Sequence, residues 1–535
     1  MADELIYDSV AENVLEGKLY SSFLGLPGVG TYPPGYPVFI SIAYLLSDDK
    51  SIVYHTILII NSILTASIIF PAYFLLHRFA SRSTAIIGSL VVATLPMLNL
   101  FTFFLLSENL FIPLFTYSIW LLVESFERES KLWDIAASVS IAILFITRTQ
   151  GLSMVIGLTL SLLCMAAVRS SFRMADAVKF TLDKKFLFLP MAALIILWVL
   201  YSSYMIPSGT YSFGSPYGVE NSYSARLAGS VTDSSVLLTY LDSLVHEIDY
   251  LLLSTYFLIM VAIAYFSYAY IKNLKIEWSL NVAIMYFSIS AAVLFVITLT
   301  FMSITHGIPS YALYGRYIEP LVPVIFIFSF IALERLPGQF ISRENAVKAL
   351  AVFMPAVLFI IYTMPLGPYN LIQTLSVYHL QALGGEMQKH VFIILFSITL
   401  FAAFVGSMFY KKSVHIFLLA LLCSSLILSS ITYDHAVKAS AGGYDNNKIL
   451  KYLEENAGSG SIVLVDQDSF STNMRYWALT KYWMGDRLVF VGAGNETDIK
   501  AYPDAEYVIS SSIDMPYEHV MAGWSNLYMI NNTAT

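Results

Sequence analysis

The sequence predicts a polytopic α-helical membrane protein with a small α/β domain at its C-terminal end. Of its 535 residues, 57% are hydrophobic and only 12% are charged, and the mean hydropathy is +0.69. A soluble fold does not need so much apolar surface. Up to residue 432 the apolar residues form runs of about 17–25 residues, the length that crosses the core of a bilayer. The composition then changes to that of a soluble domain.

The apolar runs predict about twelve membrane spans in this chain. We therefore expect a membrane-embedded domain over residues 1–432, with external segments at 1–50 and 207–249, followed by a soluble domain over residues 433–535. The expected spans lie near residues 52–76, 83–105, 109–124, 132–146, 150–168, 186–206, 250–271, 280–303, 317–334, 347–364, 391–410 and 413–432.

The soluble domain is predicted to mix helices and strands. Apolar residues at helical spacing predict helices at 446–456 and 471–483. Short β-branched runs predict strands at 461–465, 488–491 and 507–510. A small α/β domain is therefore expected after the last span.

The basic residues are distributed unevenly between the predicted loops. Sixteen of the 29 Lys and Arg residues fall in loops on one side of the membrane, six fall on the other side, and seven lie after residue 433. By the positive-inside rule, the side with sixteen faces the cytoplasm. The first loop and the C-terminal domain are then both expected outside.

The first external segment carries the most distinctive pattern. Two adjacent carboxylates, Asp3 and Glu4, stand at its start. Apolar residues from Ile6 to Leu15 recur at helical spacing, so we expect an amphipathic helix over residues 4–16 that lies along the membrane surface. The apolar run 36–46 is too short to cross a bilayer. The segment is therefore expected to stay close to the membrane.

Several motifs resemble one family in the same order. The Asp-Glu pair, a helix ending in Glu-Gly-Lys and the run Tyr-Pro-Pro-Gly-Tyr-Pro resemble the first external loop of the GT-C membrane glycosyltransferases. The resemblance is to the branch with the dolichyl-phosphate-mannose protein mannosyltransferases and the aminoarabinose transferase of lipid A. Ser-Glu-x-Leu-Phe at Glu108, Thr-Arg-x-x-Gly-Leu at Arg148 and Gly-Arg-Tyr-x-x-Pro at Arg316 resemble later segments. The resemblance implies that Asp3 is the catalytic carboxylate.

The predicted topology places five charged residues on the external face. Transfer of a sugar from a lipid phosphate needs a carboxylate for the acceptor proton and cations for the leaving phosphate. Asp3, Glu4 and Glu108 are the predicted catalytic residues. Asp3 would act as the base or orient the acceptor, Glu4 would position the loop or the acceptor, and Glu108 would hold the acceptor or a metal. Arg148 and Arg316 are predicted to bind the donor phosphate.

Tyrosines near the same face are weaker candidates. Tyr32, Tyr36 and Tyr217 are predicted to contact the sugar or the acceptor. Tyr217 belongs to the segment 207–249, whose length is typical of a functional loop over a site. The tyrosines of this segment are equally compatible with the aromatic belt that lines many membrane interfaces.

The charged candidates also have structural explanations. Asp3 and Glu4 are compatible with a solvated helix N-terminus that complements the helix dipole. Glu108 directly precedes a span and is placed to cap it, and arginines at an interface often extend to water. The ordered motifs and the scarcity of external basic residues favour function.

The function expected is that of an inverting glycosyltransferase. It would move a single sugar, mannose-like or related, from a polyprenyl or dolichyl phosphate to a glycan, lipid or protein acceptor outside the plasma membrane. No cofactor is required, and a divalent metal is compatible with the sequence but not indicated by it. The absence of a basic cluster argues against nucleic acid. The alternative is a transporter or lipid-linked sugar flippase, although transporters usually place ionisable residues at mid-bilayer. A silent assembly protein on the same scaffold is also compatible with the sequence.

The position of the acidic pair leads to a further expectation. The family pattern places a span directly before the acidic loop, whereas here the pair begins at residue 3. We therefore expect the full protein to contain a thirteenth span upstream of Met1, with a cytoplasmic N-terminus.

Overall fold

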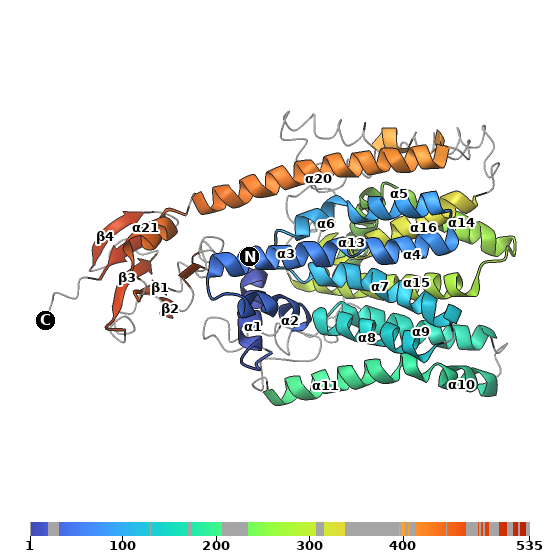
Figure 1. Ribbon diagram of the computed structural model, residues 1–535, viewed down its shortest axis with the longest axis horizontal. Coiled ribbons are helices and arrows are strands. Elements are labelled where there is room, and N and C mark those ends of the chain that lie inside the picture. The colour runs from blue at the N-terminus through green and yellow to red at the C-terminus, as the bar shows by residue number, and fades with distance from the viewer. Residues whose placement is uncertain are drawn as a thin grey trace.

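The structure, a computed structural model, is an elongated helical bundle with a small α/β unit at one end (Figure 1). The bundle spans most of the chain and the α/β unit follows it. The residues described are 2–19, 32–128, 130–169, 174–205, 234–305, 315–336, 413–445, 447–458 and 460–466, together with shorter segments between 395 and 406 and between 480 and 530.

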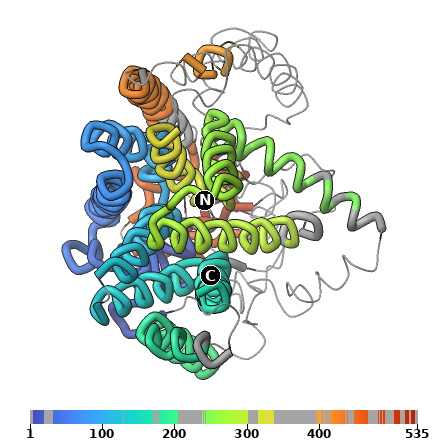
Figure 2. The backbone as a smooth tube through the Cα atoms, turned by 90° about the vertical axis from the view of Figure 1, so that its right-hand side faces the viewer, coloured from blue at the N-terminus to red at the C-terminus, as the bar shows by residue number. Residues whose placement is uncertain are grey.

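Helices of the bundle run mostly along its long axis. Figures 1 and 2 place α20 and α11 on opposite sides of the bundle. The helices are α3 (Lys50–Ala66), α4 (Ile69–Phe79), α5 (Arg82–Ala93), α6 (Pro96–Phe101), α7 (Glu108–Arg128), α8 (Lys131–Thr147), α9 (Gly151–Arg169), α10 (Met174–Asp183), α11 (Leu189–Met205), α13 (Ser234–Ser254), α14 (Leu258–Ile271), α15 (Trp278–Thr305), α16 (Leu321–Arg335) and α20 (Ser413–Asp445).

The core of the bundle is built around α16. Every residue from Leu321 to Leu333 is buried, because α4, α5 and α14 pack against this helix. A helix that is apolar on all sides is stable in such a central position. One continuous apolar cluster extends from it through the bundle.

Several helices are long and apolar enough to cross a membrane. Within the described residues there are six such segments, or seven if one bent pair is a single span. They agree with the predicted spans near 52–76, 109–124, 150–168, 186–206, 280–303 and 413–432. The predicted span at 347–364 and most of the one at 391–410 lie outside the described residues.

The prediction of one span over 83–105 is wrong. The chain breaks between α5 and α6, where Pro96 stands in the first turn of α6 and has no N–H to continue the preceding helix. The break leaves a carbonyl at Thr94 that accepts hydrogen bonds from the hydroxyls of Ser425 and Ser429, both at 2.7 Å. Helix α20 thereby satisfies a backbone group that lipid would leave unpaired.

The predicted span at 250–271 is also wrong as a straight helix. Helices α13 and α14 meet at an angle of 96°. Tyr256 and Phe257 at the bend have φ values of +50° and +59°, a region that side-chain-bearing residues rarely adopt. Because α13 begins at Ser234, the end of the predicted loop 207–249 is helical.

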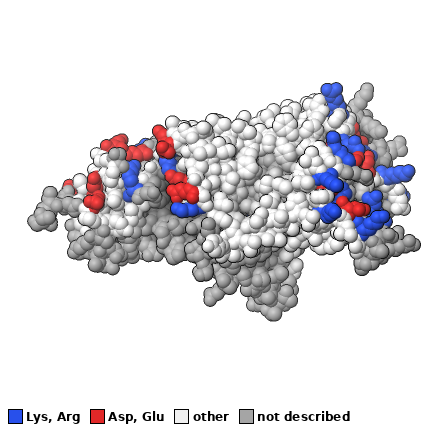
Figure 3. Space-filling view, turned by 60° about the horizontal axis from the view of Figure 1, so that its bottom comes forward, with Lys and Arg blue, Asp and Glu red and all other residues white. Residues whose placement is uncertain are grey.

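Charged side chains gather at the two ends of the molecule. Figure 3 shows Lys and Arg concentrated at one end, acidic side chains beside basic ones at the other, and an uncharged band between. We call the end where Lys and Arg are concentrated the basic end. There, Arg335 makes a bidentate pair with Glu277 at 2.7 and 2.8 Å, and Arg78 pairs with Glu127. Helix α7 runs from the opposite end, at Glu108, towards the basic end.

The α/β unit contains helix α21 and a five-stranded sheet of order β2-β1-β3-β5-β4. Strand β1 is parallel to β2 and β3, whereas β5 is antiparallel to β3 and β4. The bounds are α21 (Lys448–Asn456), β1 (Ile462–Asp466), β2 (Leu488–Val491), β3 (Ala505–Ser510), β4 (Glu518–Ala522) and β5 (Asn526–Met529).

Most predicted elements of this unit are confirmed. Helix α21 and strands β1, β2 and β3 lie where they were predicted, whereas β4 and β5 were missed. The predicted helix 471–483 lies mostly outside the described residues. Helix α20 continues without interruption past residue 432 to Asp445.

The predicted amphipathic helix exists as α1 (Ala2–Val14). Leu5, Ile6 and Val10 on its apolar face are 8%, 3% and 0% exposed. They are buried in a cluster with the α/β unit, so protein and not lipid covers this face. Figure 1 shows α1 at the end of the bundle that faces the α/β unit, next to α2 (Gly35–Ile40). The 3-10 helix η2 (Ser41–Leu45) also packs against α1.

Candidate active site

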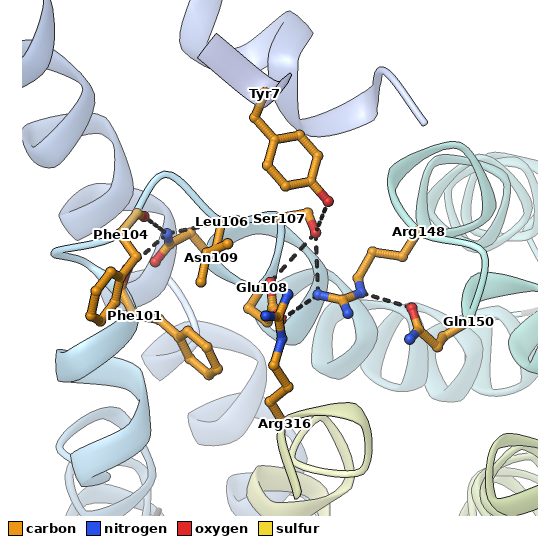
Figure 4. A network of polar contacts seen from close by, with 10 residues as sticks. All are labelled: Tyr7, Phe101, Phe104, Leu106, Ser107, Glu108, Asn109, Arg148, Gln150 and Arg316. Carbon is orange, nitrogen blue, oxygen red and sulfur yellow. Dashed lines mark hydrogen bonds and ion pairs between the residues drawn. The ribbon is translucent and has the colours of Figure 1, made fainter. Parts of the chain in front are cut away.

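The candidate site is centred on Glu108, the first residue of α7. Its side chain has no exposed surface, and its Oε1 atom contacts Nη1 of Arg148 at 2.5 Å and Nε of Arg316 at 2.8 Å. Figure 4 shows the two guanidiniums reaching this carboxylate from different elements. The structure thus brings together three residues that the sequence analysis assigned to one site, although they are far apart in the chain.

The turn between α8 and α9 positions Arg148. Its Nε donates to Oε1 of Gln150 at 2.8 Å, and its Nη1 donates to Oγ of Ser107 at 3.2 Å. Gly151 begins α9 against the end of α8, where an added Cβ would lie 2.3 Å from the carbonyl oxygen of Leu144. A glycine is therefore needed for the close turn that presents Arg148 to Glu108.

The 3-10 helix η5 (Gly315–Tyr317) positions Arg316. An added Cβ on Gly315 would lie 2.3 Å from a ring atom of Tyr250, so glycine permits this close approach. The hydroxyl of Tyr250 donates to Glu319, which is fully buried just after η5. Helix α13 and η5 are thereby joined on both sides of Arg316.

Helix α1 contacts the segment that leads into α7. Oε1 of Glu4 accepts a hydrogen bond from the backbone N–H of Leu105 at 3.1 Å, and the hydroxyl of Tyr7 bonds to Oγ of Ser107 at 2.8 Å. Glu4 therefore contacts the segment next to Glu108. The backbone of Asp3 belongs to the same helix, while its side chain lies outside the described part of the structure.

The three predicted sugar-contacting tyrosines have different outcomes. Tyr36 is fully buried and donates its hydroxyl to Oδ1 of Asn61 at 2.9 Å, so its side chain is engaged within the protein. The ring of Tyr32 is partly buried and lies edge-on to Tyr7, with ring centroids 5.3 Å apart. Tyr217 lies outside the described residues.

Two asparagines that support the site were missed by the sequence analysis. The side-chain amide of Asn109 donates to the carbonyls of Phe101, Phe104 and Leu106 at 2.9–3.1 Å. Asn61 also donates to the carbonyl of Phe104, at 3.1 Å. An amide within an apolar run such as 52–76 was the available signal, because polar groups are costly in a membrane and are rarely kept without a role.

The charges of the cluster suit an anion. Two guanidiniums and one carboxylate in direct contact leave one net positive charge, and the N-terminus of α7 adds a partial positive charge beside it. Among the described residues, no three His, Cys, Asp or Glu side chains come together as a possible metal site. The nearest partners of the Glu108 carboxylate are the two cations, and its Oε2 accepts a long hydrogen bond from Ser107 at 3.5 Å.

Comparison with known proteins identifies the fold. No family model and no curated protein matches the sequence. The crystal structure of ArnT from Cupriavidus metallidurans bound to undecaprenyl phosphate matches with a TM-score of 0.50 at 12% identity, over 98% of this chain and 92% of that chain. The chain has the GT-C fold. The apo oligosaccharyltransferase of Archaeoglobus fulgidus matches with a TM-score of 0.47 at 12% identity, over 95% of this chain and 65% of that chain.

The carboxylate of Asp8 also connects α1 to the bundle. Asp8 is 6% exposed, accepts a hydrogen bond from the hydroxyl of Tyr44, and lies 3.9 Å from Nζ of Lys50. Burial raises the pKa of the Asp8 carboxyl to about 6, against the opposing effects of Lys50 and Tyr44. The folded state then holds this proton more tightly than the unfolded chain. The stabilisation from protonated Asp8 is complete at low pH and is lost as the pH rises through about 6.

This linkage predicts a change in pH dependence for Asp8→Asn. The amide stays neutral, so the apparent melting temperature of the variant should fall less than that of the parent between about pH 5 and pH 7.5. Thermal unfolding in detergent at several pH values measures this. Glu16→Gln is the control, because Glu16 is largely exposed and pairs with Lys18 and not with Lys50. Equal slopes for the parent and Asp8→Asn would contradict the prediction.

Proposed function

We propose that the protein is a glycosyltransferase that moves a single sugar from a polyprenyl phosphate to an acceptor at the Glu108 cluster. One observation carries the proposal: the buried guanidinium of Arg148 and the partly buried guanidinium of Arg316 share a single carboxylate oxygen at one end of a GT-C bundle. The net charge of +1 on these three side chains matches the single negative charge of a phosphodiester-linked sugar. The matched ArnT structure holds bound undecaprenyl phosphate, which supports a lipid phosphate here.

The proposed chemistry assigns a role to each charged group. The acceptor oxygen forms a bond to the anomeric carbon on the face opposite the phosphate, so the configuration inverts. The bond between that carbon and the phosphate oxygen breaks, and the phosphodiester leaves as a monoester with additional negative charge. Arg148 and Arg316 stabilise that charge as it develops. Asp3 takes the proton of the acceptor hydroxyl, in the role that the family resemblance implies.

The remaining candidates support these groups. We propose that Glu108 holds both guanidiniums in place and does not itself bind the acceptor or a metal, because its Oε1 atom already contacts two cations. Glu4 holds the segment before α7 through the Leu105 N–H. Tyr32, and Tyr217 from the long external segment, remain proposed contacts to the sugar or the acceptor.

The proposed orientation follows the charge distribution. By the positive-inside rule, the basic end in Figure 3 faces the cytoplasm. The site and the α/β unit then lie on the external side of the plasma membrane. The sugar transferred is proposed to be mannose-like, and the acceptor is proposed to be a glycan, a lipid or a protein.

Arg316→Ala tests the donor site. Removing one charge-assisted contact to phosphate should lower kcat/KM by about 10–150-fold, which corresponds to about 1.5–3 kcal/mol, and should raise the KM for the donor. The purified protein is assayed with a panel of polyprenyl-phosphate sugars. Arg78→Ala is the matched control, because Arg78 is half-exposed at the basic end.

Two results would contradict the proposal. Wild-type kinetics in Arg316→Ala would place the donor phosphate elsewhere. Movement of lipid-linked sugar across proteoliposome membranes without any sugar transfer would favour a flippase instead.

A further inference from the structure

Helix α1 presents one face to the bundle. Glu4, Tyr7, Asp8 and Ala11 are spaced i, i+3, i+4 and i+7, so they share a side of the helix. Glu4 and Tyr7 bond to the segment before α7, and Asp8 bonds to Tyr44 of η2. Tyr7 and Ala11 belong to the apolar cluster of the bundle. This face therefore fixes α1 against the candidate site.

The opposite face of α1 is part of the core of the α/β unit. Leu5, Ile6 and Val10 belong to a single buried cluster with residues of that unit, and this cluster is separate from the one in the bundle. Without these three side chains the unit would expose apolar surface. Among the members on the α/β side are Ile449, Leu450, Leu453, Val463, Val465 and Ile509.

The length of α1 makes both contacts necessary. The helix has 13 residues, and isolated helices shorter than about 12–15 residues are marginal in water. Its helical state therefore depends on packing from both sides. Loss of the α/β contact would leave Leu5, Ile6 and Val10 exposed and would loosen the helix that carries Glu4 and Tyr7.

The α/β unit is itself anchored to the bundle. It follows α20, one continuous helix to Asp445, and Ser425 and Ser429 of α20 bond to the Thr94 carbonyl. Figure 1 shows the unit beyond the end of the bundle where α1 lies. The unit is thus held through α20 and also shares its core with α1.

We propose that the apolar face of the α/β unit that shares this buried cluster is a docking surface for α1, and that its occupancy sets the position of the acidic pair relative to Glu108 and Arg148. Val10 and Val463 are then positioning residues that act through α1. The docking itself is independent of the reaction, whereas its effect on turnover rests on the proposed function.

Three valine-to-alanine variants test the docking surface. Val10→Ala and Val463→Ala each remove apolar contact from the shared cluster. Val508→Ala is the matched control. Like Val463, Val508 is 0% exposed and lies in a strand of the same sheet, but it belongs to a cluster that excludes α1. Val10→Ile keeps the apolar contact and serves as the conservative variant.

Amide hydrogen exchange in the full-length protein is the first readout. Residues 4–14 should lose protection in Val10→Ala and Val463→Ala, and should keep it in Val508→Ala and Val10→Ile. Unchanged exchange of α1 in Val463→Ala would overturn the inference. So would equal loss in Val463→Ala and Val508→Ala, because α1 would then respond to general destabilisation of the unit.

Sugar-transfer kinetics give the second readout. Displacement of the acidic pair should lower kcat by about 10–100-fold in Val10→Ala and Val463→Ala. The KM for the donor should stay unchanged, because Arg148 and Arg316 are on other elements. A rise in donor KM with normal kcat would overturn the assigned catalytic effect. Absence of transfer in the parent protein would overturn the proposed function alone, and hydrogen exchange would still decide the docking.

Discussion

Replacing Asp3 with asparagine is expected to lower the rate of sugar transfer by about 10²–10⁴-fold. The amide cannot accept the proton that the acceptor hydroxyl releases when its oxygen attacks the anomeric carbon. Binding of the lipid phosphate should change little, because Arg148 and Arg316 carry that interaction in the proposed site. The expected signature is therefore a large loss in kcat with a nearly unchanged KM for the donor.

Glu12→Gln is the control for this experiment. Glu12 lies on the same helix and is largely exposed, with its carboxylate directed to Lys50 and not to the segment before α7. The control should keep wild-type turnover, which excludes a general effect of lost negative charge on α1. Near-normal turnover in Asp3→Asn would show that another group takes the proton.

The charged residues of the site could be predicted from sequence because charge is rare in this chain. With 12% charged residues, each ionisable group at the edge of an apolar run is conspicuous. The motifs around Glu108, Arg148 and Arg316 supplied the order, and the predicted topology placed them on one face. The structure brings these three side chains into direct contact. The sequence could not show that Arg148 and Arg316 both contact the same oxygen of Glu108, because that conclusion depends on interatomic distances.

Other features depend on tertiary partners that periodicity does not reveal. The apolar spacing along α1 predicted that one face of the helix is buried, but not what buries it. The α/β unit covers this face, where lipid was expected. The run at 83–105 is apolar enough to span, yet Pro96 divides it and α20 satisfies the exposed carbonyl. Strands β4 and β5 are short, so alternation gave little signal. Tyr36 carried no mark that distinguishes a buried support from a ligand contact.

Glu108→Gln is expected to produce the largest loss of stability. The change leaves the buried guanidinium of Arg148 and the partly buried one of Arg316 without their counter-charge, and breaking a buried pair by removing one partner costs about 3–5 kcal/mol. A clear fall in the apparent melting temperature of the variant in detergent measures this. Glu124→Gln is the control, because it removes a carboxylate at the basic end of the same helix, where Glu124 pairs with the exposed Arg128. Its effect should stay within about 1 kcal/mol.

Addition of a lipid phosphate separates the electrostatic explanation from general damage. If Arg148 and Arg316 bind the donor phosphate, undecaprenyl phosphate should raise the melting temperature of Glu108→Gln more than that of the parent. The anion then supplies the negative charge that the variant lacks, and binding to the native state stabilises it by mass action. An inorganic phosphate arm shows whether the anion alone is sufficient. Equal shifts in the parent and the variant would mean that the phosphate does not bind at these arginines, and Glu108 would then have only a structural role.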